Sequence, residues 1–352
     1  MAHDMTPFRI DLYSDTKTMP ARAMRQAIAD AVVGDEQHFE DPTVAQLCRR
    51  GAEMLGKEDA LFLPSGTMAN EIAVLVQCRP GDELLAHADS HILNFEGGGV
   101  AALAGVMVRA MSGARGMFDG EAVVSALRKP ARHLPRSRLL VIEQTTNLGG
   151  GAVWPLAQMT DVSGRVRDRG LSVHIDGARL FNACAASGVA AAEYAHIADT
   201  VSLDFTKGLG APFGALLAGD AATIAEAWRW KQRLGGSMRQ AGMMAAGCLY
   251  ALDHNLDRLA EDHDNARALA EGLASIPGLQ VRTPETNMVF ADLSETDLSG
   301  EAFNQALGRI GARVSLQGPN LIRAVTHLGI TRAHVDEVVE AVREFVSAKG
   351  AH

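Results

Sequence analysis

The chain has 352 residues, a length at which one hydrophobic core usually gives way to two, so we expect a large domain and a smaller one. Its net charge of −9 argues against a nucleic acid or an anionic membrane surface as partner, because both need a basic face. The four cysteines form no Cys-x-x-Cys pair, so we expect neither a zinc site nor a redox dithiol, and a reducing, cytoplasmic setting fits.

Helices and strands alternate along the first two thirds of the chain. Apolar residues at helical spacing predict a helix over residues 20–34, with Thr18 as its cap and Gly34 as its stop, and Asp41 is expected to cap a second helix. Short apolar runs then predict strands at 60–63, 83–86, 106–108, 139–143, 171–175, 200–205 and 213–217, with helices at 68–77, 120–127 and 156–169. This alternation predicts an α/β fold with a mostly parallel sheet between helices.

The pattern changes near residue 238. One long helical segment runs to residue 275, short strands follow, and a closing helix with an apolar stripe begins at Thr331. The expected organisation is an N-terminal segment, residues 1–20, that contributes to the functional site, a large domain over 21–245 and a small C-terminal α+β domain over 246–352. The longest apolar run, residues 100–108, is about half the length that a membrane-spanning helix needs, so no membrane segment is expected.

Two polar residues stand at the ends of predicted strands. Asp176 follows the run 171–175, and Lys207 follows the run 200–205. Either residue alone is most simply an exposed polar group at a strand end, but open α/β sheets bind their ligands at this edge. A lysine that forms a Schiff base with an aldehyde, and an aspartate that keeps a pyridine nitrogen protonated, are what pyridoxal 5′-phosphate requires of a protein. The pair therefore predicts that cofactor.

A phosphate site is expected at Ser65, Gly66 and Thr67, which follow a strand and open a helix. The same tripeptide also serves as a plain helix cap, and it gains weight here from the lysine and the aspartate. His91 is a candidate to stack on the pyridine ring, with a turn-capping histidine as the simpler alternative. His87 and His91 stand four residues apart, but no third ligand stands at helical spacing, so no metal site is expected.

Two arginines are candidates to bind a substrate carboxylate, because the planar guanidinium matches that group. Arg179 follows the aspartate, and Arg323 interrupts an apolar strand, where a charge usually has a partner. For Arg179, a surface arginine on a helix is the alternative.

Several motifs occur in one order along the chain. They are Asp-Leu-Tyr-Ser-Asp-Thr at 11–16, Gly-Asp at 34–35, Glu-Asp-Pro-Thr at 40–43, Pro-Ser-Gly-Thr-Met-Ala-Asn at 64–70, the run 91–98, Asp-Gly-Ala-Arg-Leu at 176–180, Lys-Gly-Leu-Gly-Ala-Pro at 207–212 and Met-Arg-Gln-Ala-Gly at 238–242. As a set they resemble the low-specificity L-threonine aldolases, which belong to the aspartate-aminotransferase-like, fold type I group of pyridoxal phosphate enzymes. The resemblance implies retro-aldol cleavage of β-hydroxy-α-amino acids (L-threonine, L-allo-threonine and phenylserine-like compounds) to glycine and an aldehyde.

The resemblance also implies roles for individual residues. Lys207 would bind the cofactor covalently, Asp176 would pair with its ring nitrogen, and His91 would stack on the ring. The remaining cofactor set would be Ser65, Gly66, Thr67, Arg179, Thr206 and, from a neighbouring subunit, Arg239; the substrate carboxylate would be bound by Ser14, Arg179 and Arg323. The family implies a homotetramer, built as a dimer of dimers with shared sites.

Two departures from the family pattern concern the substrate. Tyr13 replaces an arginine, and Thr146 stands where a histidine near the substrate hydroxyl is expected. A threonine hydroxyl can hydrogen-bond but cannot act as a base near neutral pH, so His91, directly or through a water, becomes the candidate base and Thr146 a substrate contact. The departures keep a second reading open, in which the same cofactor serves β-elimination or transamination. A third is a non-catalytic nucleotide-binding protein, for which the Gly-x-Gly-x-x-Gly fingerprint is absent after the first strand.

Overall fold

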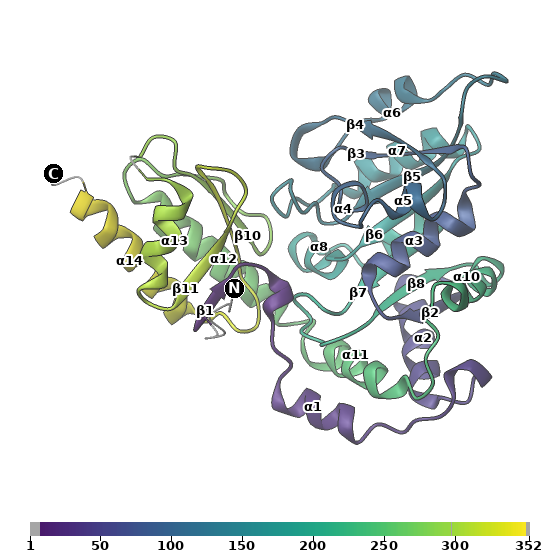
Figure 1. Ribbon diagram of the computed structural model, residues 1–352, viewed down its shortest axis with the longest axis horizontal. Coiled ribbons are helices and arrows are strands. Elements are labelled where there is room, and N and C mark those ends of the chain that lie inside the picture. Colours follow the sequence, from purple (N-terminus) through teal and green to yellow (C-terminus); the bar gives the residue numbers. More distant parts are fainter. Residues whose placement is uncertain (1–7, 297, 350–352) are drawn as a thin grey trace. The chain divides into compact units, whose positions relative to one another are not determined.

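The computed structural model describes residues 8–296 and 298–349, which form two compact units (Figure 1). The larger unit spans residues 20–256, and the smaller one joins the described part of 1–19 to that of 257–352. The expected boundary at residue 245 falls inside α11 (Gly242–His254), which lies wholly in the larger unit. Residues of the expected N-terminal segment form β1 (Ile10–Leu12) and η1 (Asp15–Lys17) of the smaller unit.

The larger unit is built on a seven-stranded sheet in the order β2-β8-β7-β6-β5-β3-β4. Its strands are β2 (Asp59–Leu63), β3 (Asp82–His87), β4 (Met107–Met111), β5 (Arg136–Glu143), β6 (Ser172–Gly177), β7 (Thr200–Asp204) and β8 (Ala215–Gly219). Neighbouring strands from β7 to β4 are parallel, and only β8 runs against its two neighbours in this sheet. The prediction of a mostly parallel α/β sheet is confirmed.

Helices cover both faces of this sheet. The helices of the larger unit are α1 (Arg22–Ala29), α2 (Pro42–Leu55), α3 (Gly66–Gln77), α4 (His91–Asn94), α5 (Gly99–Ala102), α6 (Gly120–Ala126), α7 (Leu156–Arg167), α8 (Leu180–Ser187), α9 (Ala191–His196), α10 (Ala221–Arg233) and α11. Single turns are η2 (Glu36–His38) and η3 (Ala114–Gly116). Leu217 of β8 packs with α3 and α10, whereas a Cβ on Gly51 of α2 would lie 2.3 Å from the side chain of Leu216. Since successive strand residues point to opposite faces, α2 lies on the face opposite α3 and α10.

Two helix predictions differ from the structure. The first helix ends at Ala29 rather than at Gly34 and begins after Ala21, while Thr18 ends the preceding turn, where its hydroxyl donates to the Asp15 carbonyl. The segment 238–275 divides into α11 and α12 (Leu259–Ala274). The buried Asn255 lies in the break, and its side-chain amide donates to the Leu209 carbonyl at 2.7 Å. This hydrogen bond holds Asn255 at the end of α11, and sequence periodicity does not register such a long-range contact.

Asp41 joins three segments of the larger unit. Its Oδ1 accepts the backbone N–H groups of Thr43 and Val44 at the start of α2, as the sequence predicts for a cap. Its Oδ2 accepts the N–H of Gly34 at 3.2 Å and of Gly242, the first residue of α11, at 2.8 Å. A Cβ on Gly242 would lie 2.4 Å from the carboxylate, so only glycine lets the two helix starts share it.

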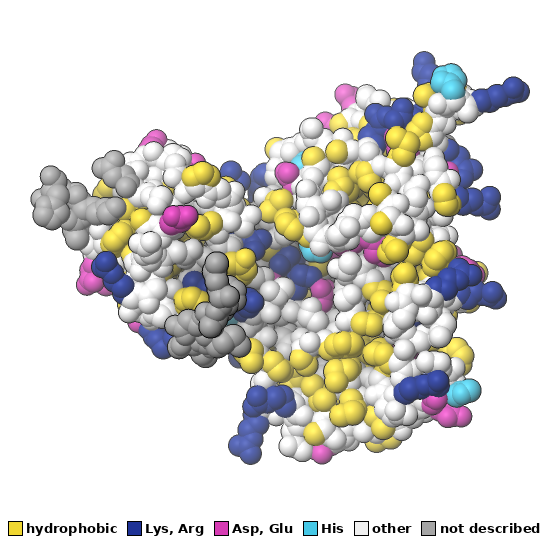
Figure 2. Space-filling model, in the orientation of Figure 1, with side chains coloured by type: hydrophobic (Ala, Val, Ile, Leu, Met, Phe, Trp, Pro, Cys, Tyr) yellow, Lys and Arg dark blue, Asp and Glu magenta, His cyan; other side chains and the backbone are white. Residues whose placement is uncertain are grey.

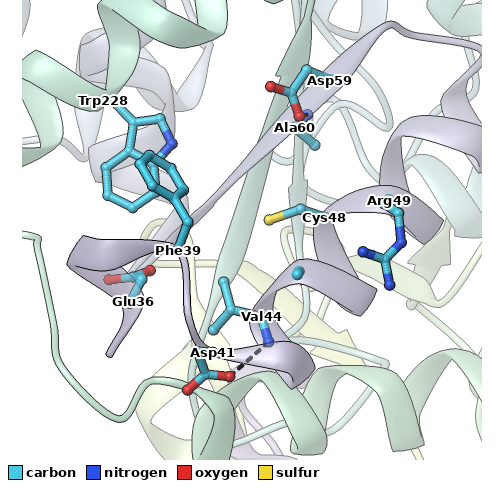
Figure 3. A pocket seen from close by; sticks show the side chains of 10 residues that line it. Glu36, Phe39, Asp41, Val44, Cys48, Arg49, Asp59, Ala60 and Trp228 are labelled. Carbon is cyan, nitrogen blue, oxygen red and sulfur yellow. Dashed lines mark hydrogen bonds between the residues drawn. The ribbon is translucent and has the colours of Figure 1, made fainter. Parts of the chain in front are cut away.

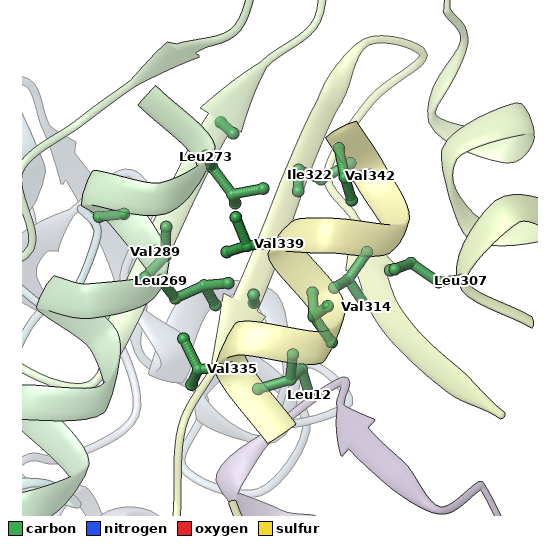
Figure 4. Close-up of a cluster of buried hydrophobic side chains, with 14 of the residues drawn as sticks. Leu12, Leu269, Leu273, Val289, Leu307, Val314, Ile322, Val335, Val339 and Val342 are labelled. Carbon is green, nitrogen blue, oxygen red and sulfur yellow. The ribbon is translucent and has the colours of Figure 1, made fainter. Parts of the chain in front are cut away.

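The smaller unit has a five-stranded sheet in the order β1-β11-β12-β10-β9, with β9 (Gln280–Val281), β10 (Met288–Asp292), β11 (Ala312–Leu316) and β12 (Leu321–Val325). Only the β1–β11 pair in this sheet is parallel. Its helices are α12, α13 (Gly300–Gly308) and α14 (Arg332–Lys349). Figure 4 shows Val335, Val339 and Val342 of α14 facing α12 and the sheet, so the predicted apolar stripe is buried as expected. No helix in the described part of either unit is long and apolar enough to cross a membrane.

We expect Asp41→Ala to lower the free energy of unfolding by about 3 kcal/mol or more, because it leaves several buried backbone donors unsatisfied at once. Asp119→Ala is the matched control, since Asp119 caps α6 through one N–H, that of Ala122, and its loss should cost about 1 kcal/mol. Urea unfolding of both variants measures the difference. Equal losses would show that the contacts to Gly34 and Gly242 contribute nothing.

Candidate active site

The chemistry-bearing residues of the larger unit lie at the carboxyl ends of its parallel strands. Asp176 of β6 is paired in register with Glu143 of β5 and with Ser202 of β7. His91 begins α4 just after β3, and Lys207 follows β7. The sequence prediction that strand ends bring Asp176 and Lys207 to one edge is therefore consistent with the strand order.

Asn70 of α3 connects this edge through four hydrogen bonds. Its amide nitrogen donates to Asp176 Oδ2 at 2.9 Å and to Glu96 Oε1 at 2.8 Å. Its oxygen accepts the Ser202 hydroxyl at 2.9 Å and is 3.0 Å from His174 Nε2. Burial lowers the pKa of His174 to about 4, so its ring is neutral and can donate to Asn70. The amide of Asn70 is thus fully used, and it fixes the Asp176 carboxylate.

His91 is held by a carboxylate and a backbone contact. Its Nδ1 lies 2.8 Å from Glu96 Oε1, and its backbone N–H donates to Glu143 Oε2 at 2.5 Å. Burial lowers the pKa of His91, but Glu96 and the nearby Asp176 outweigh that effect and raise it overall. Burial, reinforced by Asp176, raises the pKa of Glu143 to about 7. The imidazole therefore has one oriented nitrogen and a ring that remains partly exposed.

Lys207 is paired with Asp204, the last residue of β7. The ammonium group donates to Asp204 Oδ2, while Oδ1 accepts the backbone N–H of Thr206 at 2.8 Å and its hydroxyl at 2.6 Å. Burial would raise the pKa of Asp204, but Lys207 and the two Thr206 donors outweigh burial and lower it. The lysine nitrogen is thereby held close to the end of β7.

The start of α3 lies against the same group. Ser65 caps the helix, and its hydroxyl accepts the N–H of Met68 at 3.2 Å. A Cβ on Gly66 would lie 3.0 Å from Asp204 Oδ2. The structure thus brings Gly66, Thr206 and Lys207, three residues of the predicted cofactor set, to one place beside a helix N-terminus, where a phosphate group is favoured.

Other predicted residues lie elsewhere or face other groups. Arg239 is exposed and pairs with Asp35 at 2.9 Å. Arg179 is buried at the start of α8, with its N–H 3.4 Å from the Gln144 carbonyl. Thr146 is buried, and its side chain packs against the backbone of Gly116 and Gly149.

Ser14 and Arg323 belong to the smaller unit. The hydroxyl of Ser14 accepts the N–H of Thr16 at 3.2 Å, and the Arg323 guanidinium donates to the Ser315 hydroxyl at 3.1 Å. Their predicted contact with a substrate remains a prediction.

The residues present fit pyridoxal phosphate. Each oxygen of the buried Asp176 carboxylate accepts one protein hydrogen bond, from Asn70 and from the Ala178 N–H at 3.1 Å, which leaves capacity for a protonated ring nitrogen. Lys207 supplies a primary amine, and the start of α3 at Gly66 is a place that favours an anion, with the Asp204 carboxylate beside it. His91, Glu96 and Asp176 also place ligand-type atoms within 4.8 Å of one another, a spacing that could hold a metal ion. Asn70 and His91 both contact Oε1 of Glu96, whereas its buried Oε2 has no partner among the described residues.

Sequence reasoning did not assign roles to Asn70, Glu96, Glu143 and Asp204. Asn70 and Glu96 lie inside the motifs that carry the resemblance, and a polar residue in an apolar helix is itself a signal for a buried contact. Glu143 and Asp204 each end an apolar strand, and Asp176 is the residue before the end of its strand. The same strand-end rule that selected Asp176 could have found them.

Two cavities of the larger unit are not lined by a comparable set of candidate catalytic residues. One, of about 220 Å³, is lined by residues of η2, α2 and β2, with Phe39 packed edge-on against Trp228 (Figure 3). The other, of about 750 Å³, lies under the loop between α6 and β5, over which Figure 2 shows Lys and Arg side chains. Two of its arginines, Arg128 and Arg136, are paired with Glu83 and Asp82, so the cluster is not a free basic surface.

Proteins of known structure share this fold. Threonine aldolase from Leishmania major superposes with a TM-score of 0.82 at 22% identity, covering 96% of this chain and 99% of that one. Serine palmitoyltransferase from Sphingomonas wittichii gives a TM-score of 0.76 at 17% identity, over 97% and 88%. These likenesses establish the fold as the fold type I architecture of pyridoxal phosphate enzymes.

Sequence relatives define the family more closely. The family model described as beta-eliminating lyase matches residues 11–296. The low specificity L-threonine aldolase of Escherichia coli O157:H7 is 39% identical over 341 residues, 96% of this chain and 99% of the relative. Low-specificity L-threonine aldolase 1 of Arabidopsis thaliana is 38% identical over 333 residues, 93% of each chain. The chain belongs to the beta-eliminating lyase family and, within it, to the low-specificity L-threonine aldolases, as its motifs predict.

Glu71 of α3 gives a test of the site's electrostatics. It is buried, neither carboxylate oxygen has a partner among the described residues, and burial together with Glu96 raises its pKa to about 7. Because the folded state binds the proton of Glu71 more tightly than the unfolded state does, the free energy of unfolding falls as pH rises from 4.5 to about 7. We expect Glu71→Gln to stabilise the protein at pH 8 by about 1–3 kcal/mol and to have little effect at pH 4.5.

The measurement is urea unfolding at both pH values, with Glu121→Gln, at an exposed position of α6, as control. A gain that does not depend on pH would contradict a buried, protonated Glu71.

Proposed function

We propose that this protein is a pyridoxal phosphate-dependent lyase that cleaves β-hydroxy-α-amino acids to glycine and an aldehyde. L-threonine, L-allo-threonine and phenylserine-like compounds are the substrate class. The observation that carries the proposal is the buried Asp176 carboxylate, fixed by Asn70 at the strand edge that Lys207 follows. Relatives that bear the name threonine aldolase, aligned over nearly the whole chain, support the choice of reaction.

The cofactor would be held by residues with distinct tasks. Lys207 would bind its aldehyde carbon, Asp176 would pair with the ring nitrogen, and His91 would lie on the ring face. Ser65, Gly66, Thr67 and Thr206 would receive its phosphate at the start of α3, where the helix dipole favours an anion. Bound in this way, pyridoxal phosphate supplies an electron sink for the pair released when the Cα–Cβ bond breaks.

The protein residues would move the proton and orient the substrate. His91 would take the proton of the β-hydroxyl, directly or through a water, because Glu96 orients its Nδ1 and leaves Nε2 as the acceptor. The carboxylate of Asp176 would keep the ring nitrogen protonated. Arg179 would grip the substrate carboxylate and so select the bond that breaks. The family resemblance gives the same role to Ser14 and Arg323. Thr146 would contact the β-substituent.

The assembly and setting are also proposals. A homotetramer in which the partner subunit's Arg239 completes the phosphate site is supported by the exposure of Arg239 in this chain, where it pairs with Asp35. A cytoplasmic setting is supported by the cysteines, all of which are free.

The alternative of β-elimination or transamination is less favoured. The family model carries the name of an eliminating lyase, but the full-length relatives compared above are named threonine aldolases. The two chemistries differ in product: an aldolase releases glycine and an aldehyde from threonine, whereas elimination releases a keto acid from serine. Assays of both products on one preparation therefore decide between them.

We expect Lys207→Ala to abolish the visible absorbance of the lysine-bound cofactor and to lower kcat for threonine cleavage by about 10³-fold or more, because it removes the covalent anchor. Lys231→Ala is not a suitable control, since that lysine is buried against Glu36. Lys57→Ala is a suitable control, because Lys57 donates to the Ala198 carbonyl and, among the described residues, has no contact with the predicted cofactor set, so spectrum and rate should stay unchanged. A wild-type protein that stays colourless after reconstitution with pyridoxal phosphate would contradict the proposal.

The pH profile should report on His91. Glu96 raises the pKa of His91, so the neutral, proton-accepting imidazole exists only above that raised value. We expect the acidic limb of kcat/KM to move to lower pH in Glu96→Gln, because the neutral amide no longer stabilises the imidazolium. Glu121→Gln should leave the limb in place. An unshifted limb in Glu96→Gln would argue that His91 is not the base.

A further inference from the structure

Asp204 places a carboxylate between Lys207 and the start of α3. Its Oδ2 accepts the lysine ammonium, and the same oxygen would lie 3.0 Å from a Cβ on Gly66. The side chain is only 7% exposed, so water screens its charge little. It therefore lies at the end of the site where the proposed function requires the phosphate of the cofactor to bind.

In this arrangement the Asp204 carboxylate and the phosphate of the cofactor would lie close together. The first turn of α3 attracts one negative group, and Asp204 already lies against it. Thr206 and Lys207 donate to the Asp204 carboxylate, so two residues that would bind the cofactor are hydrogen-bonded to Asp204 in its absence. Two like charges a few ångströms apart in a partly desolvated site repel strongly.

We propose that Asp204 is a positioning residue that holds Lys207 at the phosphate end of the site and lowers the affinity of the protein for the phosphate group of its cofactor. The inference rests on the proposed function, because it assumes that pyridoxal phosphate binds here. Cofactor binding then requires the Lys207–Asp204 ion pair to open and the carboxylate to accommodate a second anion. The wild-type protein should therefore lose its cofactor more readily than a variant with an uncharged residue at position 204.

The test compares two ligands that differ only in the phosphate. Dissociation constants for pyridoxal 5′-phosphate and for pyridoxal are measured by absorbance titration of the full-length protein. The variants are Asp204→Asn, which keeps an acceptor for Thr206 while removing the charge, and Asp204→Ser, which removes the charge with a smaller side chain. Asp199→Asn is the matched control, since Asp199 precedes the other end of β7 and binds the Val173 N–H.

We expect both Asp204 variants to bind pyridoxal phosphate roughly tenfold more tightly, or better, than the wild type. Pyridoxal should gain less affinity than pyridoxal phosphate, because it meets only the cost of opening the Lys207–Asp204 ion pair, and Asp199→Asn should match the wild type for both ligands. Unchanged affinity for pyridoxal phosphate, or an equal change for both ligands, would overturn the inference, the latter because it would mean that Asp204 acts only through Lys207. A wild type that binds neither ligand would instead overturn the proposed function, and this inference with it.

Discussion

The structure of the site depends on one buried amide. Asn70 donates to Asp176 and to Glu96 and accepts from Ser202 and His174, so a single side chain ties α3 to two strands and to the turn that carries His91. A carboxylate as deeply buried as Asp176 is stable only if its oxygens are hydrogen-bonded. By meeting that requirement, Asn70 fixes both the proposed partner of the pyridine nitrogen and, through Glu96, the orientation of the proposed base.

Two other acids of the larger unit, Asp41 and Asp204, also accept several hydrogen bonds each. Asp41 satisfies two helix starts at once, and it does so only because Gly242 has no side chain to exclude it. Asp204 likewise serves Thr206 and Lys207. Asp41 is stabilised by donors that include the distant Gly242, whereas the donors to Asp204 are its near neighbours in the chain. Each acid fixes the positions of the groups that donate to it.

Much of the fold could be predicted from the sequence, because strand and helix periods are local. Apolar runs predict the strand that ends at Glu143, the strand over 171–175 and the apolar stripe of α14. What could not be read depends on contacts across the fold: α1 stops at Ala29, and Asn255, bound to Leu209, interrupts the helix expected over 238–275. Lys207 and Asp176 can be selected from the sequence because each follows a predicted strand, whereas the role of Asn70 requires knowing that α3 lies beside β6.

The central claim is that Lys207 alone carries the cofactor at this edge, and chemical trapping tests it most directly. The protein is reconstituted with pyridoxal phosphate, reduced with borohydride and digested, and the modified peptide is identified by mass spectrometry. The account predicts one stable phosphopyridoxyl group per chain, on Lys207. Modification of another lysine in its place, or no modification at all, would contradict it.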